Sequence, residues 1–236
     1  PGRDVALSLC VFNGKLYIFG FDEIDGVPSI RAEVREARTG DFIGVWRRAM
    51  GTLYDCATSN GRIYAVGTIN ISDNDFGWII AEFDENLNIV SMNITNPLDG
   101  VDIATAVYSD GVYIYVSGII SSASFTGYRV EKRLAEGLEL EAVYTVDVPL
   151  SWRRPYALPK IIEGSDGYLW LLYLYIDPED VERPRIEVLD RDLNYIRTID
   201  LDNIVGYPYT ILSASSGYIY IGGSMGIIKI DDKGKV

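Results

Sequence analysis

The chain has 236 residues, 48% of them hydrophobic, and a formal net charge of -13 at pH 7. Such an acidic surface repels a phosphate backbone, and no basic cluster larger than two arginines interrupts it, so we expect no nucleic-acid partner. The longest apolar run, Tyr168 to Ile176, is far shorter than the roughly 20 residues of a membrane-spanning helix. It predicts a buried strand and no membrane span.

Histidine and glutamine are both missing from the chain. The lack of histidine excludes Ser-His-Asp catalysis, Cys-His catalysis and histidine-based zinc chemistry. We expect no cofactor. An acid-rich composition without glutamine, with many Ile and Tyr, is typical of a thermophile.

A turn ending in glycine, followed by an apolar strand, occurs five times along the chain. The copies are NGKLYIFG (13–20), NGRIYAVG (60–67), DGVYIYVSG (110–118), DGYLWLLYL (166–174) and SGYIYIGG (216–223). Counted from Gly14, Gly61, Gly111, Gly167 and Gly217, they are 47, 50, 56 and 50 residues apart. A period of this length is typical of propeller blades, which hold four short strands each.

We therefore predict an all-β fold, a single five-bladed β-propeller over residues 1–236 with four-stranded antiparallel blades. The blades are expected at about residues 4–49, 50–97, 101–149, 155–201 and 207–236. In the third blade the strands are expected at 102–109, 112–118, 128–134 and 138–146. A sandwich would have no reason to repeat its sequence every fifty residues.

Two kinds of turn are expected in each blade. Asn-Gly and Asp-Gly at the first hairpin favour a type I′ turn, in which both central residues have positive φ. Polar turns are expected between the third and fourth strands, at 84–86, 135–137, 190–192 and 231–234.

The last blade is predicted to lack most of its outer strand, because the chain ends soon after the turn at 231–234. A bare third strand would present an open edge that pairs readily with another strand. We therefore expect a chain continuation or a partner strand at this edge.

The stretch FNGKLYIFGF followed by EARTGDFIGVWRRAM resembles a kelch-type propeller repeat, which has a glycine-containing second strand and a tryptophan on the outer strand. Kelch blades carry a Gly-Gly doublet after the second strand, and only Gly222-Gly223 supplies it here. Trp46 and Trp152 are the candidates for the outer tryptophan.

Three aspartates open the predicted inner strands or lie within them: Asp4, Asp55 and Asp102. Glycoside hydrolysis needs two carboxylates about 5 to 9 Å apart, one as acid and one as nucleophile or base. These three are the catalytic candidates. The alternative, which we favour, is that they are solvated or cap turns.

Acidic loops are expected between the second and third strands of several blades. Calcium takes six to eight oxygen ligands, and clustered carboxylates beside a glycine turn supply some of them. The candidates are Asp22, Asp25, Asp73 and Asp75. None matches the EF-hand spacing, and a solvated loop is the favoured interpretation.

The triplet Trp-Arg-Arg occurs twice, ahead of the second and fourth blades. With nearby tyrosines it suits a rim that stacks on a sugar or holds a carboxylate. The candidate ligand-binding residues are Trp152, Arg153, Arg154, Tyr156, Tyr209, Trp46 and Arg47. The alternative is that tryptophan fills the space between blades and the arginines pair with acids.

The two cysteines, Cys10 and Cys56, occupy similar places in the first strands of blades one and two. Two separate buried thiols are the default expectation. Adjacent inner strands also permit a structural disulfide, if the one-residue offset does not turn the side chains to opposite faces.

The first functional hypothesis is a non-enzymatic propeller that binds a protein partner or a small ligand, including a carbohydrate, on its rim. The second is a carbohydrate-active hydrolase that uses Asp4, Asp55 and Asp102. A third treats the ring as a structural module of a longer extracellular protein. Propellers serve all three roles, so the fold does not choose among them.

Overall fold

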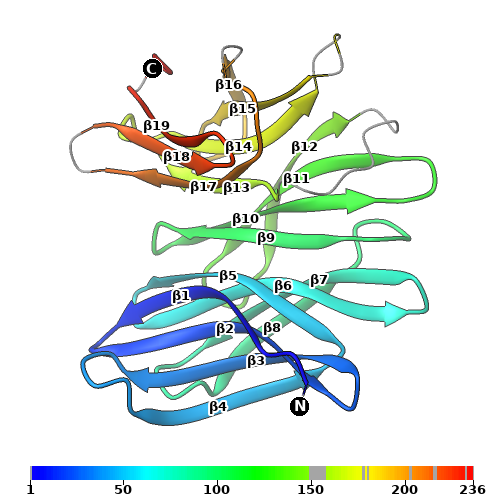
Figure 1. Cartoon of the computed structure of the whole chain (residues 1–236), viewed down its shortest axis with the longest axis vertical. Helices are drawn as coiled ribbons and strands as arrows, with labels where there is room; N and C mark the ends of the chain where they lie inside the picture. Colours follow the sequence, from blue (N-terminus) through cyan, green and yellow to red (C-terminus); the bar gives the residue numbers. More distant parts are fainter. Residues whose placement is uncertain are drawn as a thin grey trace.

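The computed structural model describes residues 2–148, 158–176, 179, 181–201, 204–214, 217–231 and 233–235. Across these residues the chain forms strands and no helix, so no helix there is able to cross a membrane. The strands form five antiparallel sheets, four with four strands and one with three (Figure 1).

Each sheet is a run of consecutive strands, which makes it one blade. The first blade has β1 (Val5–Phe12), β2 (Lys15–Ile24), β3 (Val27–Glu36) and β4 (Phe42–Ala49). The second has β5 (Gly51–Ser59), β6 (Arg62–Ser72), β7 (Asp75–Phe83) and β8 (Ile89–Thr95). The third has β9 (Ile103–Ser109), β10 (Tyr113–Ser121), β11 (Thr126–Leu134) and β12 (Leu140–Val148). The fourth has β13 (Lys160–Glu163), β14 (Leu169–Ile176), β15 (Glu182–Leu189) and β16 (Tyr195–Asp200). The fifth has β17 (Pro208–Ser213), β18 (Ile219–Gly223) and β19 (Gly226–Ile230).

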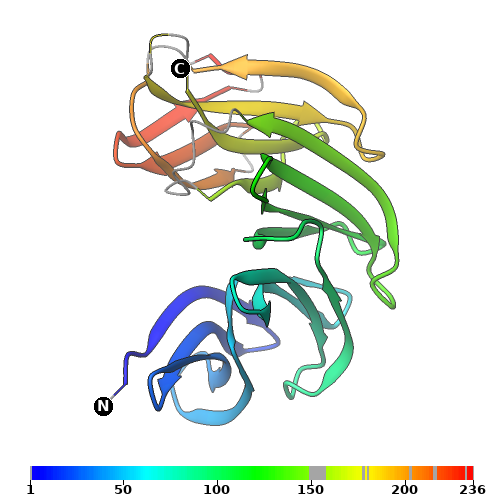
Figure 2. The ribbon, with the colours of Figure 1, turned by 90° about the vertical axis from the view of Figure 1, so that its right-hand side faces the viewer.

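The five blades form a propeller ring, as the repeat predicts, with β1, β5, β9, β13 and β17 as the inner strands. Along the ring β1 packs beside β5, β5 beside β9, β9 beside β13, and β13 beside β17. Within the described ranges no comparably extensive contact joins β17 to β1, and the first and last blades stand apart in Figures 1 and 2. The inner strands of these two blades therefore face each other across an opening.

Apolar side chains of successive blades pack face to face and form four hydrophobic clusters. Phe19 of the first blade meets Phe83 of the second, with 6.0 Å between ring centroids. Trp78 of the second blade packs with Ile114 of the third. Burial of such large side chains contributes about 1.5 to 3 kcal/mol each. The apolar run ending at Ile176 forms the second strand of the fourth blade, β14, and seven of its eight residues are buried.

The glycine at the end of the repeat lies beside a bulge in the inner strand with which it pairs. In β5 the register skips one residue, Tyr54, so that Leu53 faces Gly67 and Asp55 faces Val66. A Cβ atom on Gly67 would overlap the carbonyl oxygen of Thr52. The same relation holds at Gly20, Gly118 and Gly223, where the skipped residues are Leu7, Thr105 and Tyr209. A bulge re-aims the side chain of the extra residue, and here it occurs at the centre of the ring.

The hairpin turns follow the prediction in only part of the chain. Asn13-Gly14 and Asn60-Gly61 both have positive φ at the two central residues, as a type I′ turn requires. Asp110 and Asp166 do not have positive φ, so the expectation was wrong for the third and fourth blades. The Asp110 carboxylate instead accepts hydrogen bonds from the backbone N–H groups of Val112 and Tyr113, which stabilises a different turn.

The fifth blade has three strands in the part of the chain that the structure describes, so its outer edge is β19. Asp231 closes the turn after β19 by accepting hydrogen bonds from the N–H groups of Lys233 and Lys235. Asp84 and Asp190 close the corresponding turns of blades two and four in the same way. A strand from a partner or from further chain at this edge stays a prediction.

The third strand in each of four blades carries a buried glutamate: Glu33, Glu82, Glu131 and Glu187. Glu33 and Glu131 pair with arginines of their own strands, whereas Glu82 pairs with Arg62 of β6 and Glu187 accepts a hydrogen bond from the Tyr173 hydroxyl of β14. The most enclosed is Glu131, which is paired with Arg129 (2.8 Å) and Arg133 (2.7 Å). Buried charges of this kind require such partners, because an unpaired charge in the protein interior is very costly.

Candidate functional site: the central cavity

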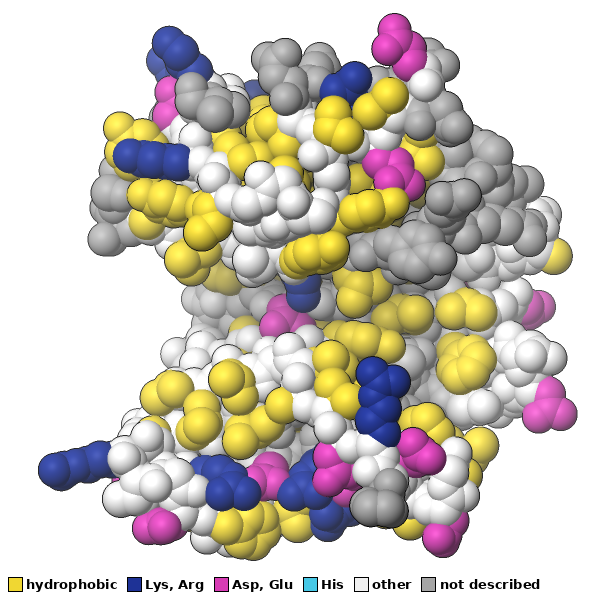
Figure 3. All heavy atoms as spheres, in the orientation of Figure 1, with side chains coloured by type: hydrophobic (Ala, Val, Ile, Leu, Met, Phe, Trp, Pro, Cys, Tyr) yellow, Lys and Arg dark blue, Asp and Glu magenta, His cyan; other side chains and the backbone are white. Residues whose placement is uncertain are grey.

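The inner strands surround a central cavity of about 590 Å³, and all five of them contribute lining residues. Figure 3 shows the face of the molecule hollowed between the first two blades and the last two. A concave site of this size that combines apolar walls with a few polar groups is the usual form of a ligand-binding pocket. The central cavity is therefore the candidate functional site.

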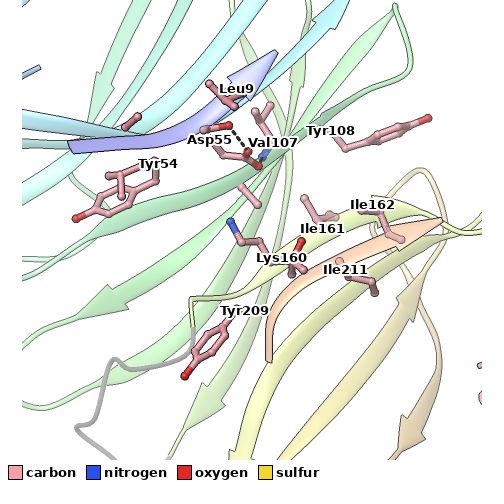
Figure 4. A pocket seen from close by; sticks show the side chains of 15 residues that line it. Leu9, Tyr54, Asp55, Val107, Tyr108, Lys160, Ile161, Ile162, Tyr209 and Ile211 are labelled. Carbon is pink, nitrogen blue, oxygen red and sulfur yellow. Dashed lines mark hydrogen bonds between the residues drawn. The ribbon is translucent and has the colours of Figure 1, made fainter. Parts of the chain in front are cut away.

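Tyrosines from three different blades line this cavity: Tyr54 of β5, Tyr108 of β9 and Tyr209 of β17. The Tyr108 ring points away from Lys160 and stacks beside Tyr115 (Figure 4). Tyr54 and Tyr209 are the skipped residues at the bulges of their strands. Tyr209 is 57% exposed, so much of its ring is open to a ligand. Tyrosine offers an apolar ring face together with a hydroxyl group that both donates and accepts.

One cation and one carboxylate also line the cavity. Lys160, the first residue of β13, donates from Nζ to the carbonyl oxygen of Thr105 at 3.0 Å. The Asp55 carboxylate accepts hydrogen bonds from Ser8 Oγ (3.0 Å) and from the Val107 N–H group (3.2 Å). Figure 4 shows Lys160 reaching into the cavity on the side opposite β1, with Asp55 beside Val107.

Burial raises the pKa of the Asp55 carboxyl above its usual value, and the charge of Lys160 acts against that rise. The two groups do not form a direct ion pair, so the ammonium group keeps donor capacity beyond its bond to Thr105. The cavity thus presents donors, acceptors and aromatic faces together. A ligand rich in hydroxyl groups has matching chemistry, because each hydroxyl both donates and accepts.

The three candidate catalytic aspartates lie in different surroundings. Only Asp55 lines the central cavity, and it is the only acid among the described residues that do. Asp4 lies before β1 beside a groove of the first blade that also contains Arg31 and Glu33. Asp102 is fully buried and accepts hydrogen bonds from the N–H groups of Leu98 and Ser121. Asp102 therefore caps a turn, which agrees with the alternative stated for the candidate carboxylates.

Burial raises the pKa of Asp102 to about 6, and this gives a testable pH dependence. An acid whose pKa is raised on folding binds its proton more tightly in the folded state, so its contribution to stability falls as the pH rises from about 4 to about 6. The free energy of unfolding of the wild type, minus that of Asp102→Asn, should fall by about 2 to 3 kcal/mol across this interval. Urea denaturation at several pH values measures it, and a difference that stays constant with pH would contradict the account.

Trp46 and Arg47 lie within the outer strand β4 rather than on the cavity. The Trp46 ring packs edge-on against Phe83 of the second blade, with 5.3 Å between ring centroids. Arg47 Nε donates to the Asp22 carboxylate at 2.7 Å. This is the arrangement described by the alternative interpretation, in which tryptophan fills the space between blades and arginine pairs with an acid.

The other predicted ligand-binding residues divide into two groups. Tyr209 lines the central cavity. Trp152, Arg153, Arg154 and Tyr156 lie outside the described residues.

Of the four candidate calcium ligands, two make other contacts and two are exposed. Asp22 is buried and pairs with Arg31 and Arg47. Asp75 accepts hydrogen bonds from the Asn96 side chain and the Gly100 N–H group. Asp25 and Asp73 are exposed. Over the described ranges no three His, Cys, Asp or Glu side chains are grouped so as to hold a metal ion.

The structure joins Cys10 of β1 and Cys56 of β5 in a disulfide, with Cα atoms 6.2 Å apart. The pair is therefore bonded rather than two separate thiols. The bond links the inner strands of the first and second blades, next to Ser8 and Asp55 in the wall of the cavity.

Lys160 and Tyr108 line the cavity but were not among the site residues predicted from the sequence. A charged residue at the start of an inner strand is the sequence feature that could have identified Lys160, which is the first residue of β13. Tyr108 also donates a hydrogen bond to Glu163 of β13, which Arg191 binds in turn. These contacts set the position of Tyr108 at the cavity, and no feature of the repeated sequence indicates that position.

No protein-family model matches the chain, and no curated protein matches it. Among solved structures, the GH43_1 enzyme from Xanthomonas citri complexed with xylose is similar, with TM-score 0.51 and 17% identity, over 95% of this chain and 86% of that one. The hydrazine synthase of Kuenenia stuttgartiensis has TM-score 0.52 and 12% identity, over 96% and 76%. The WD40 domain of coronin from Toxoplasma gondii has TM-score 0.54 and 7% identity, over 91% and 61%. At these identities the similarity shows the propeller fold alone, and the kelch-type resemblance stays a prediction.

Proposed function

We propose that this chain is a non-enzymatic propeller that binds a small saccharide in its central cavity. Lys160 and the hydroxyl groups of Tyr54 and Tyr209 would bind the sugar hydroxyls, and the tyrosine rings would pack on the sugar. The observation that carries the proposal is the composition of the cavity wall, which combines a cation, a carboxylate and three tyrosines from different blades. The predicted rim residues Trp152, Arg153, Arg154 and Tyr156 stay candidates for further contacts.

The structural neighbours support a sugar as the ligand to test first. One of them was crystallised with xylose and another with xylotriose. Both are described as GH43 enzymes, whereas the described wall of the cavity in this chain holds a single acid. A hydrolase needs a second carboxylate at a defined distance, and this difference favours binding over cleavage.

Xylose binding should depend on the two cavity residues that remain most available to a ligand. Lys160→Met keeps the aliphatic stem but removes the ammonium group, and Tyr209→Ala removes an aromatic face. Each should weaken xylose binding about tenfold or more, the usual effect of losing a charge-assisted hydrogen bond or a stacked ring. Isothermal titration calorimetry with xylose measures the change.

Tyr195→Ala is the matched control, because Tyr195 is an exposed tyrosine on the outer strand β16. Its affinity for xylose should equal that of the wild type. If Lys160→Met and Tyr209→Ala also bind xylose like the wild type, the sugar does not occupy the central cavity. If the wild type does not bind xylose at all, the proposal fails for this sugar class.

The second candidate is a hydrolase that uses Asp55, and the raised pKa of this carboxyl is the observation in its favour. A raised pKa suits a general acid. The experiment is incubation with 4-nitrophenyl β-D-xyloside, whose cleavage releases coloured nitrophenolate. We expect no release; turnover that disappears in Asp55→Asn would establish the hydrolase instead.

A further inference from the structure

A second pocket of about 420 Å³ lies at the first residues of β5 and β9, next to the central cavity. Tyr54 lines both spaces, so the two pockets adjoin at this residue. Gly51 and Thr52 precede Tyr54 in the wall of this second pocket, and Asp55 follows it in the wall of the central cavity. A single ligand that passes Tyr54 would therefore contact both.

The second pocket differs from the central cavity in its chemistry. Its described lining contains no charged side chain, and its walls come largely from Val27, Met50, Phe76, Val101 and Ile103. The hydroxyl of Thr68, a polar group in this wall, is already bonded to the carbonyl oxygens of Gly77 and Asp102. The pocket therefore suits an apolar group.

Met50 is held in an unfavourable conformation at this pocket. It has φ of 65°, in the left-handed region that favours glycine. Its N–H group donates to Pro28 at 3.0 Å and its carbonyl accepts from Asn70 at 2.8 Å, which fixes the backbone. The side chain is nevertheless 51% exposed. Strained residues of this kind gather at ligand-binding sites, and an apolar ligand would cover this exposed side chain.

We infer that the ligand is an amphipathic glycoside, with its sugar in the central cavity and an apolar aglycone, aromatic or aliphatic, in the pocket beyond Tyr54. This inference rests on the proposed function, because it takes the sugar site as given. The two linings match the two parts of such a ligand: the central cavity has the charged groups Lys160 and Asp55, the second pocket has mostly apolar walls without a charged side chain, and Tyr54 borders both.

The test compares xylose with 4-nitrophenyl β-D-xyloside by calorimetry on the whole chain. The wild type should bind the aryl xyloside about tenfold more tightly or better, since burial of an aromatic ring removes apolar surface from water. Val101→Asp places a charge in the apolar pocket and should abolish this gain while leaving xylose affinity unchanged. Met50→Gly removes the side chain at a position whose φ suits glycine, so it should reduce the gain without harming the fold.

Val112→Asp is the matched control, because Val112 is an exposed valine in a hairpin turn away from this pocket. This variant should still bind the aryl xyloside more tightly than xylose by the same factor as the wild type. Equal affinities of the wild type for xylose and the aryl xyloside would overturn the inference and leave the sugar site standing. A gain that survives both Val101→Asp and Met50→Gly would also overturn it. Failure of both ligands to bind would instead reject the proposed function.

Discussion

Replacing Glu131 by alanine is expected to destabilise the propeller by about 3 to 5 kcal/mol, the cost of breaking a buried ion pair from one side. Glu131 is fully buried on β11, and its two oxygens are bound by Arg129 and Arg133. Alanine would leave the Arg133 guanidinium, whose side chain is only 4% exposed, without its carboxylate. Urea denaturation monitored by tryptophan fluorescence measures the loss.

Glu33→Ala provides the comparison, because Glu33 occupies the same place on β3 of the first blade. Its partners are Arg31 and Arg35, and the Arg35 side chain is 37% exposed. Water can solvate those arginines once the carboxylate is removed, so the loss of stability should be clearly smaller. Equal losses of stability in Glu33→Ala and Glu131→Ala would show that burial of the arginine partners does not determine the loss.

Removal of the disulfide is the second change with a large expected effect. Cys10 and Cys56 are separated by 46 residues, and a cross-link across a loop of this length stabilises the folded state by about 4 kcal/mol in the chain-entropy treatment. The double variant Cys10→Ala, Cys56→Ala should therefore unfold at a markedly lower urea concentration than the oxidised wild type.

Reduction of the wild type gives an independent measurement of the same bond. The reduced wild type and the double variant should unfold at similar urea concentrations, both below that of the oxidised protein. An oxidised wild type that unfolds together with the double variant would contradict a stabilising link between the first and second blades.

The propeller was predictable because each blade repeats the same local chemistry. The glycine that closes NGKLYIFG and NGRIYAVG could be recognised as periodic. The reason for it could not, because the bulge in the inner strand appears only when β1 and β5 are paired with their neighbours. The fourth blade lacks this glycine and has Tyr173 in its place, although its strands still form a blade.

The buried glutamates show a limit of the same approach. Glu33, Glu82, Glu131 and Glu187 occur 19 to 21 residues after their turn glycines, which is a second periodic signal. In sequence they look like solvent-facing residues of alternating strands, and only the packing of adjacent blades buries them. Asp102 is a similar case, since it is fully buried and accepts a hydrogen bond from the Leu98 N–H group.

The candidate site was predictable only in part. Asp55 and Tyr209 were named from the sequence and both line the central cavity. The bulges that direct Tyr54 and Tyr209 toward the centre depend on strand register, and the place of Lys160 depends on ring geometry. The order of residue types along a single strand indicates neither the strand register nor the geometry of the ring.

The most direct test of the account is the crystal structure of the protein soaked in 4-nitrophenyl β-D-xyloside. We expect an intact glycoside, with its sugar between Lys160 and Tyr209 and its nitrophenyl ring in the pocket lined by Met50 and Val101. Density for a cleaved sugar beside Asp55, or for a glycoside bound only outside the central cavity, would contradict it.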